Sequence, residues 1–297
     1  MNIIDILMCP ECKSGLSEDL KCKGCHNQYN FKDKVFDVVS RKLSYNLLEG
    51  PEKPWVERTR SQKEMEEAAL SVGIAPKAWY SQEETEKLML ALVEIDKNRA
   101  HISEEYEQAW QQLYKKFDDF LNPLLNSLSG TVCDLATGLG GHLERLLNIE
   151  SKDFNIVCID ICKDIMPIYL EYNSKLFWVA ADARYMSIKD NSFDYITSHG
   201  AFDAVAECDK VAKEMYRTLK PHGKLIVRGA YVKKDSKSFE IAKSMNREKG
   251  ILEEYLIQEL ENAGFKNIVS TIVAQIRFDE QEDSDMRYCY VIQAEKF

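Results

Sequence analysis

Short apolar segments alternate with segments of helical periodicity from Thr131 to the C-terminus, and this alternation constrains the fold most. The candidate strands are Val132–Ala136, Asn155–Ile161, Phe177–Ala181, Phe193–Ser198, Lys224–Arg228, Asn267–Gln275 and Tyr288–Ala294. Helices are predicted between them, at His142–Leu147, Asp164–Tyr172, Asp203–Leu219 and Ile251–Ala263. Such alternation is typical of α/β proteins with a parallel sheet. No helix separates the last two strands, so we expect the sheet to end in an antiparallel strand.

A glycine-rich turn follows the first of these strands. Asp134 lies in the strand, and Gly138, Gly140 and Gly141 follow it before the next helix. Glycine lets the backbone turn sharply and approach a ligand closely. The spacing does not fit the dinucleotide fingerprint, whose third glycine would fall at Leu143, and the turn lacks the Gly-Lys-Ser/Thr of a phosphate loop. Nicotinamide-dependent oxidoreductases and P-loop NTPases are therefore disfavoured.

Two carboxylates follow at the ends of later strands. Asp160 ends the second strand, twenty residues after Gly140, where a carboxylate can accept hydrogen bonds from both hydroxyls of a ribose. Asp182 ends the third strand, in a position to face an adenine edge. The stretch from Leu219 to Gly223, with a proline and a glycine, ends a helix and turns into the fifth strand. Each feature alone has a structural explanation, as a cap or a turn, but their order together favours a nucleoside site.

With these motifs, residues from about 130 to 297 resemble the class I S-adenosylmethionine-dependent methyltransferases. The family's first motif, Asp-Leu-Gly-x-Gly-x-Gly, corresponds to the stretch from Asp134 to Gly140, with Ala136 in place of a glycine. The resemblance implies an α/β fold, a Rossmann-like seven-stranded methyltransferase sheet with an antiparallel final strand. It also implies that S-adenosyl-L-methionine binds at the residues that match the family's motifs or adjoin them: Asp134, Ala136, Gly138, Gly140, Asp160, Ile161, Asp182, Ala183 and His199.

Candidate residues for the chemistry lie after the fourth and fifth strands. Methyl transfer from a sulfonium is an in-line displacement, so positioning supplies most of the catalysis, and a base is needed only if the acceptor must lose a proton. His199 has an ordinary pKa near neutrality and is the candidate catalytic base, with packing over the adenosine as the alternative. Phe202, Arg228 and Tyr231 are candidate contacts for an acidic or aromatic acceptor.

Four of the nine cysteines lie within the first 25 residues, as the C-x-x-C pairs Cys9/Cys12 and Cys22/Cys25. Two such pairs suit a tetrahedral, structural Zn²⁺, which lets a short segment fold without a large core. Disulfides would need an oxidising compartment, and a redox site would need only one pair. His26 is an alternative to Cys25 as the fourth ligand.

The segment with these four cysteines, which we call the zinc ribbon, gives a second, weaker resemblance. It is similar to the cysteine ribbon of bacterial 23S ribosomal RNA guanine methyltransferases. An RNA acceptor therefore stays open, and so does a non-catalytic module that docks through its ribbon. The net charge of −10, without a broad basic segment, favours a small-molecule acceptor over RNA.

The pattern divides the chain into a zinc ribbon (1–48), a helical linker or lid (49–128) and a methyltransferase domain (129–297). We hypothesise that the ribbon and the helical segment cover the acceptor site as a lid. No apolar run reaches the ~18 residues that span a bilayer. The N-terminus lacks the features of a signal peptide, so we expect a cytoplasmic protein that does not bind membranes. The pattern does not indicate an oligomeric state.

Overall fold

The structure is a computed structural model that describes residues 1–32, 34–40, 68–74, 87, 90–91, 104–138, 140–149, 153–161, 175–205, 207–244, 247–277 and 285–297. Most of the predicted helical segment before residue 104 and the helix predicted at 164–172 lie outside the described residues.

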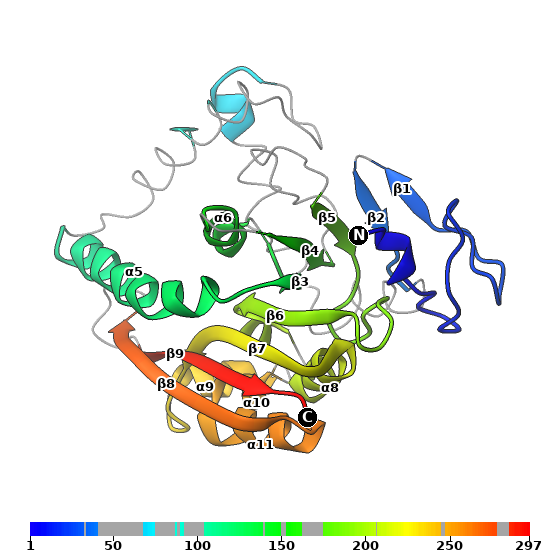
Figure 1. Cartoon of the computed structure of the whole chain (residues 1–297). Helices are drawn as coiled ribbons and strands as arrows, with labels where there is room; N and C mark the ends of the chain where they lie inside the picture. Colours follow the sequence, from blue (N-terminus) through cyan, green and yellow to red (C-terminus); the bar gives the residue numbers. More distant parts are fainter. Residues whose placement is uncertain are drawn as a thin grey trace.

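A mixed β-sheet of nine strands forms the centre of the molecule (Figure 1). Its order is β1-β2-β5-β4-β3-β6-β7-β9-β8. The strands from β2 to β7 along this order are parallel to their neighbours, whereas β1 pairs antiparallel with β2 at one edge, and β9 and β8 run antiparallel at the other. The strands are β1 Asn30–Lys32, β2 Val35–Asp37, β3 Gly130–Leu135, β4 Phe154–Asp160, β5 Leu176–Ala180, β6 Phe193–His199, β7 Leu219–Tyr231, β8 Lys266–Arg277 and β9 Met286–Glu295.

All seven predicted strands are present, but the predicted count of seven for the whole sheet is wrong. The two further strands, β1 and β2, come from the N-terminal ribbon and extend the sheet beyond β5. The edge of β5 would otherwise expose unpaired backbone groups, and pairing with β2 covers them. The antiparallel end formed by β9 and β8 agrees with the prediction.

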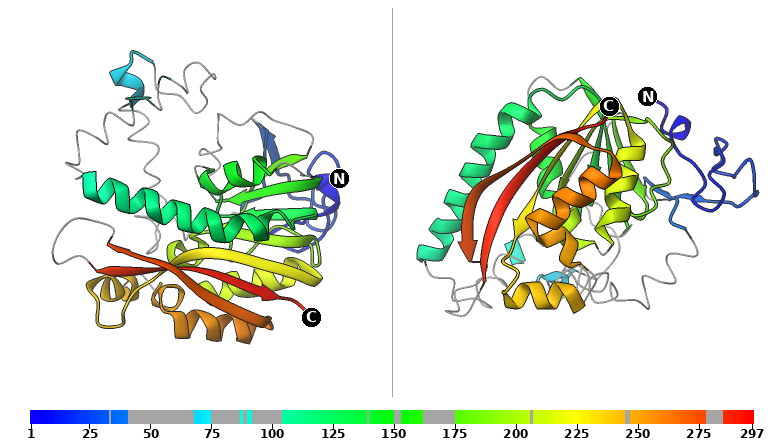
Figure 2. Two further views of the ribbon diagram at one scale, coloured as in Figure 1. Left: turned by 60° about the vertical axis from the view of Figure 1, so that its left-hand side comes forward. Right: turned by 90° about the horizontal axis from the view of Figure 1, so that it is seen from below.

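Helices cover both faces of this sheet (Figures 1 and 2). α5 (Glu104–Leu125) and α6 (Gly141–Leu147) pack on one face, and α8 (Cys208–Thr218) and α11 (Glu253–Ala263) pack on the other. The shorter helices are α7 Ala201–Ala204, α9 Lys237–Ser244 and α10 Glu248–Ile251, and a 3₁₀ helix spans Ile3–Asp5.

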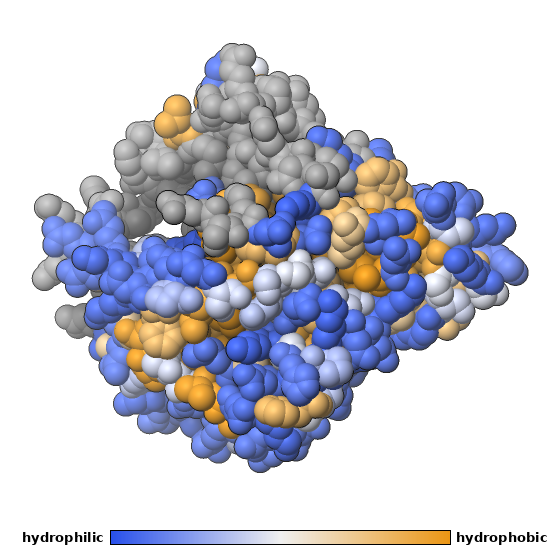
Figure 3. Space-filling model, viewed as in Figure 1, coloured by the Kyte–Doolittle hydropathy of each residue, from blue (hydrophilic) through white to orange (hydrophobic). Residues whose placement is uncertain are grey.

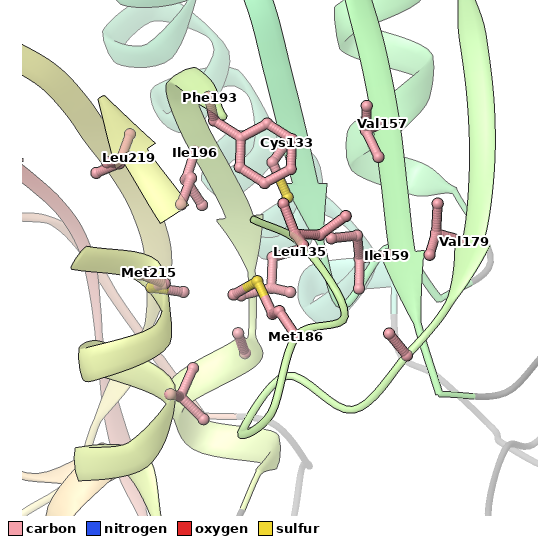
Figure 4. Packing of buried hydrophobic residues seen from close by; sticks show 14 of the residues in the cluster. Cys133, Leu135, Val157, Ile159, Val179, Met186, Phe193, Ile196, Met215 and Leu219 are labelled. Atoms are coloured by element: carbon pink, nitrogen blue, oxygen red, sulfur yellow. The ribbon is translucent and has the colours of Figure 1, made fainter. Parts of the chain in front are cut away.

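α5 presents an apolar stripe to the sheet, because Leu113, Phe117, Leu121 and Leu125, each four residues apart, are buried against it. On the opposite face, Leu135, Ile159 and Val179 of neighbouring strands pack together near Met215 of α8 (Figure 4). The parallel strands are therefore buried on both faces, as their continuous apolar runs predict.

Two predicted helices are each divided in the structure. The helix expected at 203–219 consists of α7 and α8, and the one expected at 251–263 begins with α10 and continues as α11 after Leu252. Glu207 precedes α8 with a φ of 58°, a left-handed conformation that a continuous helix cannot contain.

The turn predicted at 219–223 lies inside β7. The register moves from Phe193–Leu219 to Tyr195–Lys224, so β7 places more residues than β6 between the two pairs and bulges outward. His222 adopts a φ of 64° within this bulge.

The N-terminal ribbon packs on the same core as the rest of the sheet. Leu7 forms a β-bridge with Ile188, and the amide of Met8 donates to the carbonyl of Ser187 at 2.9 Å. Cys9 and Phe36 of the ribbon belong to the apolar cluster that surrounds Leu135. The ribbon therefore contributes to the core, and its position is fixed by β2 at one edge of the sheet.

On the face shown in Figure 3, hydrophilic residues predominate and hydrophobic residues form separate patches. Among the helices of the described part of the chain, none is long and apolar enough to span a bilayer.

Candidate functional site

The loop between β3 and α6 turns through left-handed backbone conformations. Ala136, Gly138 and Gly140 have φ values of 55°, 53° and 86°. Glycine adopts such angles freely, whereas an L-residue such as Ala136 pays roughly 1–2 kcal/mol. The amide of Ala136 donates to the carbonyl of Ile159 at 2.8 Å, and the amide of Gly140 donates to the carbonyl of Thr137 at 3.0 Å. These bonds hold the strained turn against the end of β4.

Asp160, at the end of β4, contacts this loop directly. Its Oδ2 accepts a hydrogen bond from the amide of Gly138 at 2.9 Å, and the side chain is 4% exposed. Among the described residues, a Cβ added to Gly138 would meet only the carbonyl oxygen of Ala136, at 4.0 Å, so this part of the chain leaves the space beside the loop open. A carboxylate beside an open glycine turn is the arrangement that holds the ribose of a nucleoside.

Asp134 lies beneath the loop and is fully buried. Among the described residues, neither of its carboxyl oxygens has a hydrogen-bond partner, and the hydroxyl of Thr137 donates instead to its main-chain carbonyl at 2.7 Å. Burial and the neighbouring charge of Asp160 raise the pKa of Asp134 to about 8. The carboxyl group is therefore mostly protonated at neutral pH in this state.

Asp182 follows the carboxyl end of β5, next to Asp160 at the carboxyl end of β4. The amide of Ala181 donates to the carbonyl of Asp160 at 3.0 Å. Both of its carboxylate oxygens accept hydrogen bonds from the Arg184 side chain, at 3.1 Å and 2.9 Å. Arg184 also donates to Glu207 at 3.1 Å. The sequence did not indicate this buried ion-pair network. An adenine edge at Asp182 would share the carboxylate with Arg184.

The remaining predicted cofactor residues lie around these two carboxylates. Ile161 follows Asp160 and is half-buried. Ala183 follows Asp182 and packs, partly buried, against the core cluster of Leu135.

His199 ends β6 and is paired across the sheet with Arg228 of β7. Its Nδ1 lies 2.6 Å from Nη2 of Arg228. Because a guanidinium group can only donate, Nδ1 must accept, and the proton of the neutral imidazole lies on Nε2. His199 is exposed as a residue, but the protein atoms around its imidazole and the charge of Arg228 lower the pKa of His199 far below its ordinary value. In this arrangement His199 presents a hydrogen-bond donor at Nε2, whereas the sequence suggested a base.

The three predicted acceptor contacts are not brought together. Arg228 and Tyr231 are three residues apart on β7, so their side chains point to opposite faces of the sheet. Tyr231 is buried in the core and stacks on Tyr290 with ring centroids 4.0 Å apart. Phe202 is 1% exposed and belongs to the same core cluster. Of the three, Arg228 alone lies beside His199.

Sequence reasoning gave no role to His142, which lies near Arg228 and His199. It is buried on α6, and neither ring nitrogen has a partner among the described residues. Burial and the charges of Arg228 and Arg145 lower the pKa of His142 to about 3. The sequence around His142 does not indicate that it lies beside Arg228, because only the packing of α6 on the sheet places it there.

The two cysteine pairs form a second site, in the ribbon. The Sγ atoms of Cys9, Cys12, Cys22 and Cys25 all lie within 4.8 Å of one another. Cys9 and Cys25 are 3.6 Å apart and Cys12 and Cys22 are 3.3 Å apart, close to the ~3.8 Å between two thiolates on one tetrahedral Zn²⁺. All four are free thiols, not disulfides. The group includes Cys25 and not His26, so the donor set fits a Cys₄ site.

The ribbon does not lie over the predicted acceptor residues. β2 pairs with β5, and in the sheet order β4, β3 and β6 separate β5 from β7. The sheet order gives no support to the hypothesis that the ribbon covers the acceptor site, since the ribbon lies beside the strand that leads to Asp182. Most of the helical segment that was expected to share this role lies outside the described residues.

Residues 133–227 match the family model described as a methyltransferase domain. The matched residues include the loop, Asp160, Asp182 and His199, within a doubly wound sheet that ends in antiparallel strands. This region is thus similar to a methyltransferase domain.

Curated relatives match between a third and two fifths of the chain. Phosphoethanolamine N-methyltransferase 2 of Caenorhabditis elegans is 26% identical over 39% of this chain and 26% of its own length. The ubiquinone/menaquinone biosynthesis C-methyltransferase of Rickettsia prowazekii is 28% identical over 37% of this chain and 47% of its own length. The Citrobacter koseri enzyme of the same name is 31% identical over 33% of this chain and 41% of its own length. The chain thus spans less than half the length of these relatives.

Solved structures are also similar to part of the chain. Phosphoethanolamine N-methyltransferase 2 of Haemonchus contortus, in complex with phosphomonomethylethanolamine and S-adenosylhomocysteine, has a TM-score of 0.48 at 17% identity over 63% of this chain and 52% of its own. An arsenic(III) S-adenosylmethionine methyltransferase of Chlamydomonas reinhardtii has a TM-score of 0.44 at 18% identity over 56% of this chain and 63% of its own.

Proposed function

We propose that this protein is an S-adenosylmethionine-dependent methyltransferase that transfers a methyl group to a small-molecule acceptor. The observation that carries the proposal is the hydrogen bond between the Gly138 amide and Asp160. This bond joins an open glycine turn to a buried carboxylate at the carboxyl ends of parallel strands, where ligands of doubly wound sheets bind. The family match to residues 133–227 supports the same function.

The residues present fit the cofactor. Asp160 would accept hydrogen bonds from the ribose hydroxyls, and the backbone at Gly138 would approach the ligand closely because glycine has no side chain. Asp182 would meet the adenine edge while it stays paired with Arg184. S-adenosylmethionine, when bound, supplies a methyl group on a positively charged sulfur.

This chain's own residues contribute mainly by positioning. Holding an acceptor in line with the methyl group lowers the entropic part of the barrier. His199, with its proton on Nε2, would donate a hydrogen bond to an acceptor atom or to the cofactor. An acceptor with a lone pair needs no base for this displacement.

The choice of a small-molecule acceptor rests on two observations. The net charge of the chain is −10, which disfavours binding to phosphate backbones. The relatives are named for phosphoethanolamine and for ubiquinone/menaquinone biosynthesis, in which the methyl acceptors are small molecules. An RNA acceptor remains the alternative, because the ribbon resembles that of ribosomal RNA methyltransferases.

We extend the proposal to a structural Zn²⁺ in the ribbon, held by Cys9, Cys12, Cys22 and Cys25. The support for this site is geometric, since the four Sγ atoms lie within 4.8 Å of one another, and a bound metal would favour the thiolate form of each cysteine. Four protein ligands leave no open coordination position, so this metal would stabilise the fold and take no part in methyl transfer.

Isothermal titration calorimetry with S-adenosylhomocysteine tests the cofactor assignment. We expect saturable binding with one site per chain, and absence of binding to protein whose fold is verified by circular dichroism would contradict the proposal. Incubation of cell extract with methyl-labelled cofactor, followed by mass spectrometry, tests turnover. A labelled small molecule is expected. Labelled RNA would support the alternative acceptor, and cofactor binding without any labelled product would indicate a non-catalytic module.

A further inference from the structure

Nitrogen-bearing side chains gather where β3, β6 and β7 end. We call this group the basic cluster, and it consists of His142, Arg145, His199 and Arg228. Leu135 at the end of β3 pairs with Ser198, so His199 lies one step beyond, level with the start of the loop at Ala136. The basic cluster therefore adjoins the proposed cofactor loop.

Arg228 is the buried centre of the cluster. It is 3% exposed, and its guanidinium carbon lies 4.8 Å from the centroid of the Phe117 ring. Nη2 is bonded to His199, whereas Nε and Nη1 have no acceptor among the described residues. Burial and the nearby charge of Arg145 lower the pKa of Arg228 only to about 10, so the group carries a full positive charge at neutral pH.

No carboxylate in the described residues is bonded to this charge. Asp118 of α5 is nearby, but its Oδ1 accepts from Nε of Arg145 at 2.8 Å. Within the same described residues, His142 adds two buried nitrogens without partners. A buried cation is costly unless an anion compensates it, and buried polar groups without partners are rare in folded proteins. Within the described part of the chain no group supplies this compensation, and a bound anion would supply it.

We propose that the basic cluster binds an anionic group, a carboxylate or a phosphate, of the methyl acceptor. The inference rests on the proposed function, because it assigns the chemistry of the acceptor in the same site. The N–H groups of Nε and Nη1 point in different directions, and each can donate a charge-assisted hydrogen bond to an oxygen of such a group, while His199 can donate another through Nε2.

The position of the cluster favours the acceptor over the cofactor as the source of the anion. Asp160 lies at the end of β4, on one side of β3, whereas His199 and Arg228 lie on the other side, on β6 and β7. An acceptor bound beside the nucleoside, on the side of β3 where β6 and β7 lie, would contact the basic cluster. The cofactor's sulfonium is itself positive, so an anionic acceptor would also offset the repulsion between it and Arg228.

Phosphate binding to the full-length protein tests this inference. The protein is first saturated with S-adenosylhomocysteine, and inorganic phosphate is then titrated while the ³¹P line width is recorded. We expect saturable binding to the unsubstituted protein. Arg228→Met keeps an unbranched side chain against Phe117 but removes the charge, and it should raise the half-saturating phosphate concentration at least tenfold.

Lys224→Met is the matched control, because Lys224 lies on the same strand, is half exposed and faces Glu295. Its half-saturating phosphate concentration should equal that of the unsubstituted protein. If Arg228→Met does not fold, His142→Leu provides a second variant. It removes a buried polar group that has no partner in the described residues, and it should weaken phosphate binding several-fold.

Three outcomes separate the possible failures. Absence of S-adenosylhomocysteine binding would overturn the proposed function. Binding of that nucleoside without saturable phosphate binding would overturn only the present inference. A third arm compares S-adenosylhomocysteine with 5′-methylthioadenosine, which lacks the amino-acid carboxylate. If Arg228→Met weakens binding of the first and not of the second, the cluster holds the cofactor's carboxylate and the assignment to the acceptor is overturned.

Discussion

The amide of Gly138 donates to the carboxylate of Asp160 across a distance of 2.9 Å, although the two residues are 22 positions apart in the chain. The bond connects the loop after β3 to the end of β4, and each partner restrains the other. The negative charge is thereby held in place before a ligand arrives, which lowers the entropic cost of binding.

Asp160→Asn should weaken the binding of S-adenosylhomocysteine by about 10–100-fold, because hydrogen bonds from the ribose to a charged acceptor contribute roughly 1.5–3 kcal/mol. Titration calorimetry measures this change. Asp153→Asn is the control, since Asp153 precedes the other end of β4 and its exposed carboxylate pairs with Lys175. Equal affinities of the two variants would contradict the role given to Asp160.

The buried carboxyl group of Asp134 should make the stability of the protein depend on pH. Its pKa is about 8 in the folded protein and 3.8 as the ordinary value. Between these values the folded state keeps a proton that the unfolded state has released. The contribution of Asp134 to stability is therefore complete below pH 4, falls by about 1.4 kcal/mol per pH unit as the pH rises and is lost above pH 8.

Asp134→Asn removes this titration. The free energy of unfolding is measured in urea at pH 6 and at pH 8. From pH 6 to pH 8, the free energy of unfolding of the variant should rise by about 2 kcal/mol relative to that of the original protein. Comparison of the two proteins at each pH cancels the contributions of all other titrating groups. A constant difference between the proteins would show that Asp134 is ionised in the folded state.

The ion pair of Arg184 and Asp182 should contribute far more to stability than an exposed pair. Both side chains are nearly buried, at 6% and 3% exposed, so Arg184→Met leaves a buried carboxylate without its partner. We expect a loss of about 3–5 kcal/mol in the free energy of unfolding. Lys175→Met breaks the exposed pair with Asp153 and should cost less than about 1 kcal/mol. Similar losses in urea unfolding of the two variants would contradict this difference.

Purified protein should contain one Zn²⁺ per chain, and Cys22→Ala should abolish it. The melting temperature should fall as well, because a structural metal contributes directly to folding. Cys208→Ala removes a buried thiol far from the ribbon in sequence and should leave the metal content unchanged. Atomic absorption and differential scanning calorimetry measure the two quantities, and full metal content in Cys22→Ala would contradict the Cys₄ assignment.

The same substitution should also weaken S-adenosylhomocysteine binding several-fold. Asp37 of β2 pairs with Ala180 of β5, two residues before Asp182, and the amide of Val38 donates to the carbonyl of Ala180 at 3.1 Å. Loss of the metal would loosen β2 and with it the end of β5. An unchanged affinity would show that the two sites are independent.

The central strands could be predicted from the sequence because each is a short apolar run between turn residues. β4 and β6 begin or end within one residue of the predicted bounds. Prediction failed where local signals were ambiguous. Pro221 and Gly223 indicate a turn, but pairing with β6 accommodates them as a bulge within β7. The division of one predicted helix into α7 and α8 depends on the left-handed conformation of Glu207, which no sequence period reveals.

By itself, the sequence determined the doubly wound core, the glycine loop with its carboxylate at Asp160 and the four-cysteine ribbon, because strand periodicity, turn chemistry and ligand spacing are local properties of a chain. Only the tertiary structure decided that the ribbon extends the sheet, that Tyr231 and Phe202 belong to the core, and that Asp182 is paired with Arg184. It alone placed His142 beside Arg228 and oriented His199 as a donor. These relationships join residues from different elements, and they arise when helices pack on the sheet and bury charges together.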